Sequence, residues 1–340
     1  MRMNHLVTVL MPVYNGEKYL KESIESILNQ TFRDFEFIII DDGSADKSAE
    51  IIKSFNDTRI RLERNETNLG LIKTLNKGLG LSKGKYIARM DCDDISLSKR
   101  LSVQINFMEK HPEIGVCGSW VKIIGLKQKF VNRYPQKHEE ARAYLLFNTP
   151  FAHPSVIIRK ELVDKYNLKY DEGYKHAEDY ELWSRAVEHT KISNIPKVLL
   201  HYRMHDKSVS KNNSLTQAEN SNKVRIKLLK KLGINPTPAE LDIHRRFIRP
   251  DYLNSKDFID QLEDWFGKLL SANEKMMIYE QESLAKIISS RWLNTCNTNA
   301  SLGFWVFKKF RQSPLRKTGF DDFGKTIKFL IKCLLRKKAS

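Results

Sequence analysis

Residues 91–94 form the sharpest chemical feature of the sequence, the acidic run Asp91-Cys92-Asp93-Asp94. Three carboxylates within four residues repel one another unless a cation lies among them. A hard divalent cation relieves that repulsion, and Mg²⁺ commonly shares such carboxylates with substrate phosphates. The alternative is a solvated loop that caps the next helix, although capping accounts for one Asp and not for three. The run alone leaves both interpretations open.

Two pairs of adjacent acidic residues are the next candidates. Asp41 and Asp42 precede Gly43-Ser44, which is typical of a turn followed by a helix cap. A carboxylate there could also accept hydrogen bonds from a base or a ribose. Glu178 and Asp179 precede an apolar stretch, where the helix dipole favours acidic residues. That pair could instead supply a general base that removes a hydroxyl proton.

Several common catalytic motifs are absent from the sequence. No G-x-G-x-x-G follows a predicted strand, which disfavours a dinucleotide-binding enzyme. Residues 80–85 resemble a P-loop but are one residue short, and there is no G-x-S-x-G or H-E-x-x-H. His153 and the segment 201–205 supply imidazoles, for which a structural role is the commoner one.

The acidic runs fall between elements that alternate along the first 125 residues. The predicted strands are residues 6–11, 35–40, 59–63, 86–90 and 114–124, and the predicted helices are 17–30, 44–55, 71–81 and 97–110. This alternation predicts an α/β fold, a mostly parallel sheet flanked by helices. Ligands bind such sheets at the carboxyl ends of the strands. We therefore expect residues 41–42 and 91–94 to face one crevice.

The remainder of the chain is mixed and then helical. Strands are predicted at 156–158 and 198–203 and helices at 178–188, 223–232, 258–270 and 274–292. A polar segment rich in Asn and Ser, residues 211–221, marks a boundary. We expect a catalytic domain at 1–210, with a nucleotide-binding half at 1–125 and an acceptor-side half at 126–210, and a helical C-terminal region at 211–340.

Composition and charge narrow the class of protein. The chain has 340 residues, 41% of them hydrophobic and 29% charged, which excludes wholesale disorder. Its net charge of +17 predicts an anionic partner. No apolar run approaches the ~18 residues that span a bilayer. The start lacks the features of a signal peptide and the four cysteines lack metal or redox spacing, so we expect a cytoplasmic protein.

The last 37 residues carry a large part of the positive charge. Eleven Lys and Arg between 304 and 340 are opposed only by Asp321 and Asp322. On a helix, Phe323, Ile327, Leu330, Ile331 and Leu334 would share one face, opposite basic residues. This pattern suits a helix lying on an anionic membrane. A terminal helix docked on the catalytic domain fits the pattern equally well.

Four segments in order resemble the family 2 inverting glycosyltransferases of the GT-A fold. They are Val9-Leu10-Met11-Pro12-Val13-Tyr14-Asn15-Gly16, Ile38-Ile39-Ile40-Asp41-Asp42-Gly43-Ser44-Ala45-Asp46, Ala88-Arg89-Met90-Asp91-Cys92-Asp93-Asp94 and His176-Ala177-Glu178-Asp179-Tyr180-Glu181-Leu182-Trp183. Asn68-Leu69-Gly70 is also in the family's usual place, and the likeness covers about residues 5–210. The resemblance implies a metal-dependent enzyme with the acidic run as its D-x-D motif.

The resemblance also implies roles for single residues. The implied nucleotide-binding residues are Pro12, Tyr14, Asn15, Glu17, Asp41, Asp42, Asn68, Gly70 and Asp91, with Asp42 on the base and Asp41 supporting it. Asp93 would bind Mn²⁺ or Mg²⁺, and His205 would approach the metal or the diphosphate. Asp179 would be the general base, and Glu178 would position acceptor or donor.

The implied reaction is one inverting transfer from a nucleotide sugar, a UDP-sugar, to a hydroxyl of a glycan or lipid-linked acceptor. Cell-envelope polysaccharide assembly at the inner face of the plasma membrane would suit such a hexosyltransferase. The Q-x-x-R-W motif and membrane helices of processive members are missing, which favours single additions. The rivals are a nucleotidyltransferase acting on sugar phosphates and a nucleic-acid-binding protein. We expect no nucleic-acid partner, because the basic charge is concentrated in the tail.

Overall fold

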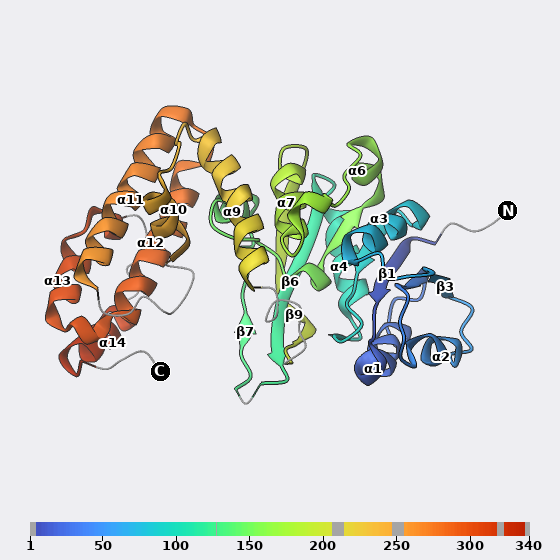
Figure 1. The fold of residues 1–340 in the computed structure, drawn as a ribbon. Helices are drawn as coiled ribbons and strands as arrows, with labels where there is room; N and C mark the ends of the chain where they lie inside the picture. Colours follow the sequence, from blue (N-terminus) through green and yellow to red (C-terminus); the bar gives the residue numbers. More distant parts are fainter. Residues whose placement is uncertain (1–4, 127, 206–213, 247–254, 318–322, 337–340) are drawn as a thin grey trace. The chain divides into compact units, whose positions relative to one another are not determined.

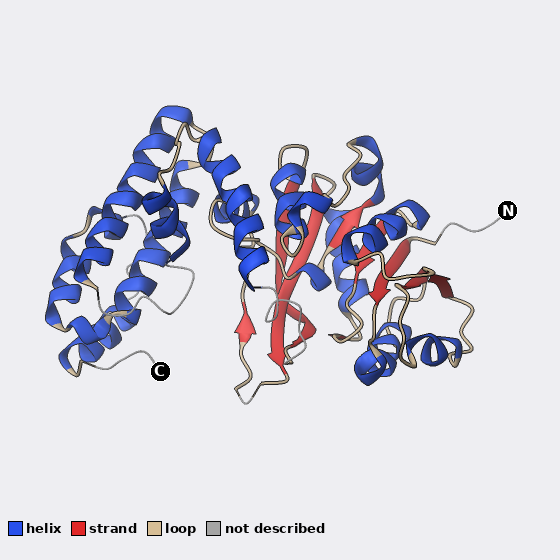
Figure 2. Cartoon of the chain, viewed as in Figure 1, coloured by secondary structure: helices blue, strands red, loops and turns tan. Residues whose placement is uncertain are grey.

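The computed structural model describes residues 5–126, 128–205, 214–246, 255–317 and 323–336 (Figure 1). The chain divides into two compact units. The first consists of residues 1–141 with 149–221, and the second of residues 142–148 with 222–340. The sheet lies in the first unit and the second unit is helical (Figure 2).

The sheet has the strand order β3-β2-β1-β4-β8-β6-β9-β5, with β7 paired to β6. Its strands are β1 Val7–Val13, β2 Phe35–Asp41, β3 Ile60–Arg64, β4 Tyr86–Arg89, β5 Ile95–Ser96, β6 Ile114–Ile124, β7 Val131–Asn132, β8 Ile157–Arg159 and β9 Lys191–Arg203. The first four form a parallel block. β8 runs antiparallel to both β4 and β6, while β6 and β9 are parallel. The predicted α/β fold is confirmed, and its parallel character is strongest in the N-terminal half.

Helices cover both faces of the parallel block. Alternate residues of β1 and β2, such as Val9 and Phe37, share a core with α1 (Glu17–Leu28), α2 (Ser48–Lys53) and α4 (Arg100–Lys110). Leu10 points to the other face, where α3 (Leu71–Leu81) approaches so closely that a Cβ at Gly78 would lie 2.3 Å from it. Because both faces are buried, β1 and β2 are apolar at nearly every position.

The rest of the first unit carries the predicted acceptor side. Its helical elements are α5 His138–Leu145, which runs into the second unit, η1 His153–Ser155, α6 Lys160–Lys165, η2 Glu172–Tyr174 and α7 Glu178–Ala186. Helix α7 begins with acidic residues in its first turn, which its dipole favours, and buries Tyr180, Leu182 and Trp183. The predicted helix at 178–188 is confirmed, and the strand predicted at 198–203 is the end of the longer β9.

The described part of the second unit is helical. Its helical elements are α9 Ser214–Lys231, α10 Pro238–Arg246, α11 Lys256–Met276, α12 Gln281–Thr298, η3 Ala300–Leu302, α13 Phe304–Gln312, η4 Pro314–Lys317 and α14 Phe323–Leu334. The prediction of one helix over 274–292 is wrong. The chain turns at Met277, whose φ is +48°, and Asn273 closes the turn by hydrogen bonds to both the N–H and the carbonyl of Tyr279.

The boundary between the units lies later in the chain than the expected boundary after residue 210. The division falls after Ser221, so that the start of α9 belongs to the first unit. Residues 206–213, including the first part of the polar segment, lie outside the described residues. Within the described part of the chain, no helix combines the length and apolarity needed to cross a membrane.

Candidate active site

The loops after β1 and β2 hold each other through hydrogen bonds at the carboxyl edge of the sheet. The Asn15 N–H donates to Ser44 Oγ over 2.9 Å, and Ala45 N–H donates to Asn15 Oδ1 over 3.0 Å. The Lys47 N–H donates to Glu17 Oε2 over 3.1 Å. Asn15 and Glu17 thus fix the shape of this edge. Pro12 is buried within β1, whereas the Tyr14 side chain is half exposed beside the loop.

Asp41 and Asp42 have different environments although they are adjacent. Asp42 accepts hydrogen bonds from Asn65 Nδ2 at 2.7 Å, from the Leu69 N–H at 3.0 Å and from the Gly70 N–H at 2.9 Å. Both of its oxygens therefore hold the loop that contains Asn68, an exposed residue. The neighbouring Gly43 has φ +71° and lies against this loop, where a Cβ would come within 2.6 Å of the Thr67 carbonyl carbon.

The two oxygens of the buried Asp41 carboxylate have different partners. Its Oδ1 accepts a hydrogen bond from the Ser44 N–H at 3.0 Å. Its Oδ2 lies 3.1 Å from Arg64 Nε but has no hydrogen bond within the described part of the chain. Both Asp42 oxygens are thus engaged in hydrogen bonds, whereas Asp41 Oδ2 has, among the described residues, the Arg64 ion pair alone.

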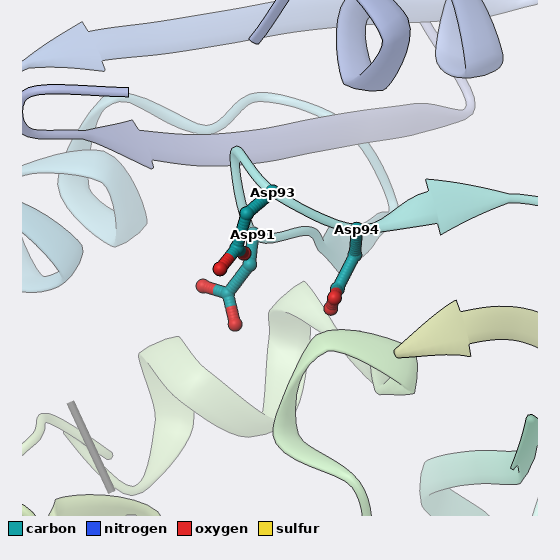
Figure 3. Close-up of side chains that lie close together, drawn as sticks. All are labelled: Asp91, Asp93 and Asp94. Carbon is teal, nitrogen blue, oxygen red and sulfur yellow. The ribbon is translucent and has the colours of Figure 1, made fainter. Parts of the chain in front are cut away.

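The three acidic residues after β4 come together (Figure 3). One carboxylate oxygen from each of Asp91, Asp93 and Asp94 lies within 4.8 Å of the others. Asp91 and Asp93 point into the same space, and Asp94 stands to one side of them (Figure 3). Burial, followed by the charges of Asp91 and Asp93, raises the pKa of the Asp94 carboxyl. Its Oδ2 is buried without a hydrogen bond to any described residue.

The end of β9 supplies the partners of this acidic cluster. His205 Nε2 lies 3.0 Å from Asp93 Oδ2. Arg203 donates from its backbone N–H to Asp94 Oδ1 and from Nε to the Asp93 carbonyl, both over 2.8 Å. Carboxylate oxygens beside one imidazole nitrogen are a donor set that Mn²⁺ or Mg²⁺ accepts. The residues present therefore fit the predicted cation.

A buried arginine pairs with the acidic cluster. Arg89 is 4% exposed, and its Nη1 and Nη2 lie 2.6 and 2.5 Å from the Asp91 carboxylate oxygens. Burial raises the pKa of both Glu178 and Asp179, and the positive charge of Arg89 offsets part of that rise. The sequence analysis missed this residue. The available signal was its position two residues before Asp91 at the end of a strand, where side chains i and i+2 share a face.

Glu178 and Asp179 form the first turn of α7. Glu178 is 6% exposed, its Oε2 has no hydrogen-bond partner in the described chain, and burial with the Asp179 charge raises its pKa to about 7. Asp179 is half-buried and accepts a hydrogen bond from the Tyr180 N–H at 2.7 Å. Burial also raises the pKa of Asp179.

His153 contacts Tyr170 and the α7 residue Trp183. Its Nε2 lies 2.8 Å from the Tyr170 hydroxyl, and its ring packs against the edge of Trp183. Burial, followed by the charge of Arg89, lowers the pKa of His153. The lowered pKa favours the neutral imidazole, which packs among aromatic side chains.

The fold and the sequence place the chain among known proteins. A family model described as "Glycosyl transferase family 2" matches residues 8–166. The fold is that of GT-A glycosyltransferases: the structure of S. aureus TarS 1–349 in complex with UDP-GlcNAc aligns with a TM-score of 0.56 at 19% identity, over 97% of this chain and 90% of that one. The mannosyltransferase PcManGT of Pyrobaculum calidifontis, in complex with GDP-Man and Mn²⁺, aligns with a TM-score of 0.55 at 15% identity, over 99% and 89%.

Relatives in sequence define the family. An uncharacterized glycosyltransferase of Haemophilus influenzae is 34% identical over 246 residues, which cover 68% of this chain and 76% of the relative. The O-antigen biosynthesis glycosyltransferase WbnJ of Escherichia coli is 33% identical over 218 residues, covering 62% and 84%. The chain belongs to glycosyltransferase family 2. The predicted resemblance and the predicted enzyme class are both confirmed.

Proposed function

We propose that this family 2 glycosyltransferase is a metal-dependent, inverting hexosyltransferase that uses a UDP-sugar. Its acceptor would be a hydroxyl of a glycan or lipid-linked substrate in cell-envelope polysaccharide biosynthesis. The observation that carries the proposal is the acidic cluster: one carboxylate oxygen from each of Asp91, Asp93 and Asp94 lies within 4.8 Å of the others, and His205 lies beside Asp93. Support for the donor and pathway comes from relatives such as TarS with UDP-GlcNAc and the O-antigen enzyme WbnJ.

The nucleotide would lie over the loops after β1 and β2. The half-exposed Tyr14 ring offers a surface for the base, and Asp41 Oδ2 an acceptor for its N–H groups or for ribose hydroxyls. Asn68 and Gly70 would border this pocket, held in place by Asp42. Asn15 and Glu17 would keep the pocket's floor in shape through their contacts with residues 44–47.

Asp93 and His205 would hold the cation, with Asp91 and Asp94 close by. A bound divalent cation offsets the negative charge that develops on a leaving diphosphate. Arg89 holds both oxygens of Asp91, so that this carboxylate keeps one orientation toward the donor. Arg203 fixes the backbone of Asp93 and the carboxylate of Asp94 in the same way.

The carboxylates of α7 would handle the acceptor proton. Asp179 would accept the proton of the acceptor hydroxyl as its oxygen bonds to the anomeric carbon. The bond from that carbon to the diphosphate oxygen breaks in the same displacement, which inverts the centre. Glu178, with a pKa of about 7, is in part protonated at neutral pH and can donate a hydrogen bond to a substrate oxygen.

A thermal-shift panel tests the donor site. The panel contains UDP, GDP, dTDP, CMP and their common sugars, nucleoside triphosphates and a DNA duplex, each with and without Mn²⁺. The proteins are wild type, Asp93→Ala and, as matched control, Asp264→Ala, which changes an exposed Asp on α11. A ligand at 100 times its Kd stabilises the folded state by about 2.7 kcal/mol.

We expect UDP with Mn²⁺ to raise the melting temperature of wild type and the control but not of Asp93→Ala. A shift with another diphosphate instead would overturn the choice of UDP. A shift with triphosphates or DNA alone would favour a nucleotidyltransferase or a nucleic-acid-binding protein. An equal shift in Asp93→Ala would remove Asp93 from the donor site.

A further inference from the structure

Helix α14 is anchored by one narrow edge. Phe329 and Cys333 are both 1% exposed. The Phe329 ring contacts Phe307 and Phe310 of α13, each with ring centroids 5.6 Å apart. These contacts attach α14 to the helical unit and account for only part of its apolar surface.

A second apolar edge of α14 faces outward. Ile327, Ile331, Leu334 and Leu335 are 41%, 49%, 64% and 58% exposed. Ile327, Ile331 and Leu334, at positions i, i+4 and i+7, form one stripe along the helix, and Leu335 follows directly after its last residue. Contiguous exposed apolar surface of this kind marks a site of interaction with a protein or a membrane. We call these four residues the outer stripe.

A row of positive charge borders the outer stripe. Lys328, Lys332 and Arg336 follow one another at intervals of four residues and are all exposed. At 100° per residue Lys328 and Lys332 lie between the outer stripe and the buried edge, and Arg336 follows in the turn after the helix. None of the three makes an ion pair with any described residue of the chain. We call these three residues the basic row.

We propose that α14 docks on an anionic lipid surface through the outer stripe and the basic row. Apolar side chains at the acyl boundary, with Lys and Arg reaching the headgroups, form the arrangement of an interfacial helix. Lys and Arg side chains near an anionic surface are attracted to it. The surface would bring a lipid-linked acceptor near the enzyme, so the inference extends the proposed function without depending on the donor.

Charge distinguishes a lipid surface from a second copy of the chain. A symmetric dimer through the outer stripe would bring the same patch of both copies together. The two basic rows would then lie near each other without any anion between them, which costs free energy. An anionic lipid surface complements both the stripe and the row, and it is therefore the occupant that the structure favours.

Vesicle flotation with the full-length protein tests the inference. The vesicles are phosphatidylcholine alone and an equal mixture of phosphatidylcholine and phosphatidylglycerol. The test variants are Ile331→Asp with Leu334→Asp, and Lys328→Glu with Lys332→Glu. The matched control is Leu215→Asp with Met277→Asp, which changes two apolar residues that are 78% and 82% exposed outside α14. Circular dichroism and thermal melting without ligand verify that each variant is folded.

We expect wild type and control to float with the mixed vesicles and not with phosphatidylcholine alone. The variant Ile331→Asp with Leu334→Asp should bind the mixed vesicles at least tenfold more weakly. The variant Lys328→Glu with Lys332→Glu should lose its preference for the anionic lipid. Added salt should weaken the binding of wild type to the mixed vesicles. Absence of binding to mixed vesicles, equal binding to both vesicles, or an equal loss in the control overturns the proposal. A dimer in light scattering that the variant Ile331→Asp with Leu334→Asp dissociates would show that a second copy occupies the stripe instead.

Discussion

Arg89 and Asp91 form a two-point ion pair at the end of β4, with Nη1 and Nη2 at 2.6 and 2.5 Å from the two carboxylate oxygens. The arginine is buried, and its charge reaches the carboxylates of α7 as well as that of Asp91. A buried charge without its partner is strongly unfavourable. The pair therefore fixes the orientation of Asp91 at the acidic cluster.

Two substitutions of Arg89 should distinguish its role in orienting Asp91 from the effect of its positive charge. Arg89→Lys keeps the charge but loses the two-point geometry, because an ammonium group cannot match both carboxylate oxygens. We expect kcat to fall about tenfold or more with a small change in melting temperature, whereas Arg89→Met should destabilise the fold by about 3–5 kcal/mol. Steady-state kinetics and thermal melts provide the measurement. The control is Arg59→Lys, because Arg59 also contacts both carboxylate oxygens of its partner, Asp57, just before β3. An equal loss of kcat in the control would contradict a positioning role for Arg89.

Asp179→Asn tests the proposed general base. The substitution keeps the size of the side chain but removes its ability to take a proton. We expect UDP–Mn²⁺ binding to remain and transfer to fall about 10²–10⁴-fold, the range for loss of a general base. Binding is measured by calorimetry and transfer by release of UDP. Asp164→Asn, on α6, is the control and should be active; near-normal turnover of Asp179→Asn would exclude it as the base.

Glu178→Gln should change how stability depends on pH. The pKa of Glu178 is raised to about 7 in the folded chain, so the folded state binds this proton more tightly than the unfolded state. The stabilisation is complete below a pH of about 4.5 and is lost as the pH rises through about 7. Removing this group should make the variant more stable relative to wild type at pH 8 than at pH 4, by up to about 3 kcal/mol.

Melting curves at intervals from pH 4 to pH 8 measure the effect of Glu178. The difference between Glu178→Gln and wild type is the informative quantity, because other titrating groups contribute equally to both proteins. If the two melting temperatures stay parallel over this range, Glu178 has an ordinary pKa in the folded chain. A difference of the opposite sign would show that its ionised form is the stabilised one.

Substitutions of Asp41 and Asp42 should affect different properties, UDP binding for Asp41 and stability for Asp42. Asp42→Ala leaves three donors around residues 65–70 without their acceptor, and each buried unsatisfied group costs about 1–3 kcal/mol. We expect a clear fall in melting temperature. Asp41→Asn keeps an acceptor for the Ser44 N–H and should weaken UDP binding with a smaller effect on stability. The thermal-shift assay reports both quantities, and a reversed pattern would restore Asp42 as the ligand contact.

Much of the fold follows from local patterns in the sequence. Apolar runs at β1 and β2, each followed by polar residues, predict buried parallel strands whose carboxyl ends share an edge. The helix at α7 was predictable from its acidic start and apolar spacing. The turn at Met277 was not, because it depends on Asn273, whose side chain closes it by contacts that no spacing rule shows. The apolar periodicity predicted a helix through this position, and the turn at Met277, with its positive φ, separates α11 from α12.

The sequence by itself determined the α/β class, the family and the identity of the acidic groups, because alternation and short motifs are local properties. Only the tertiary structure decided their environments. Pairing of β9 with β6 carries Arg203 and His205 to Asp93, more than 100 residues away along the chain. Burial sets the pKa of Glu178, and the loop at 65–70 occupies Asp42 but leaves an oxygen of Asp41. These pKa shifts and hydrogen-bond partners depend on long-range packing and desolvation, which differ even between adjacent residues of the same type.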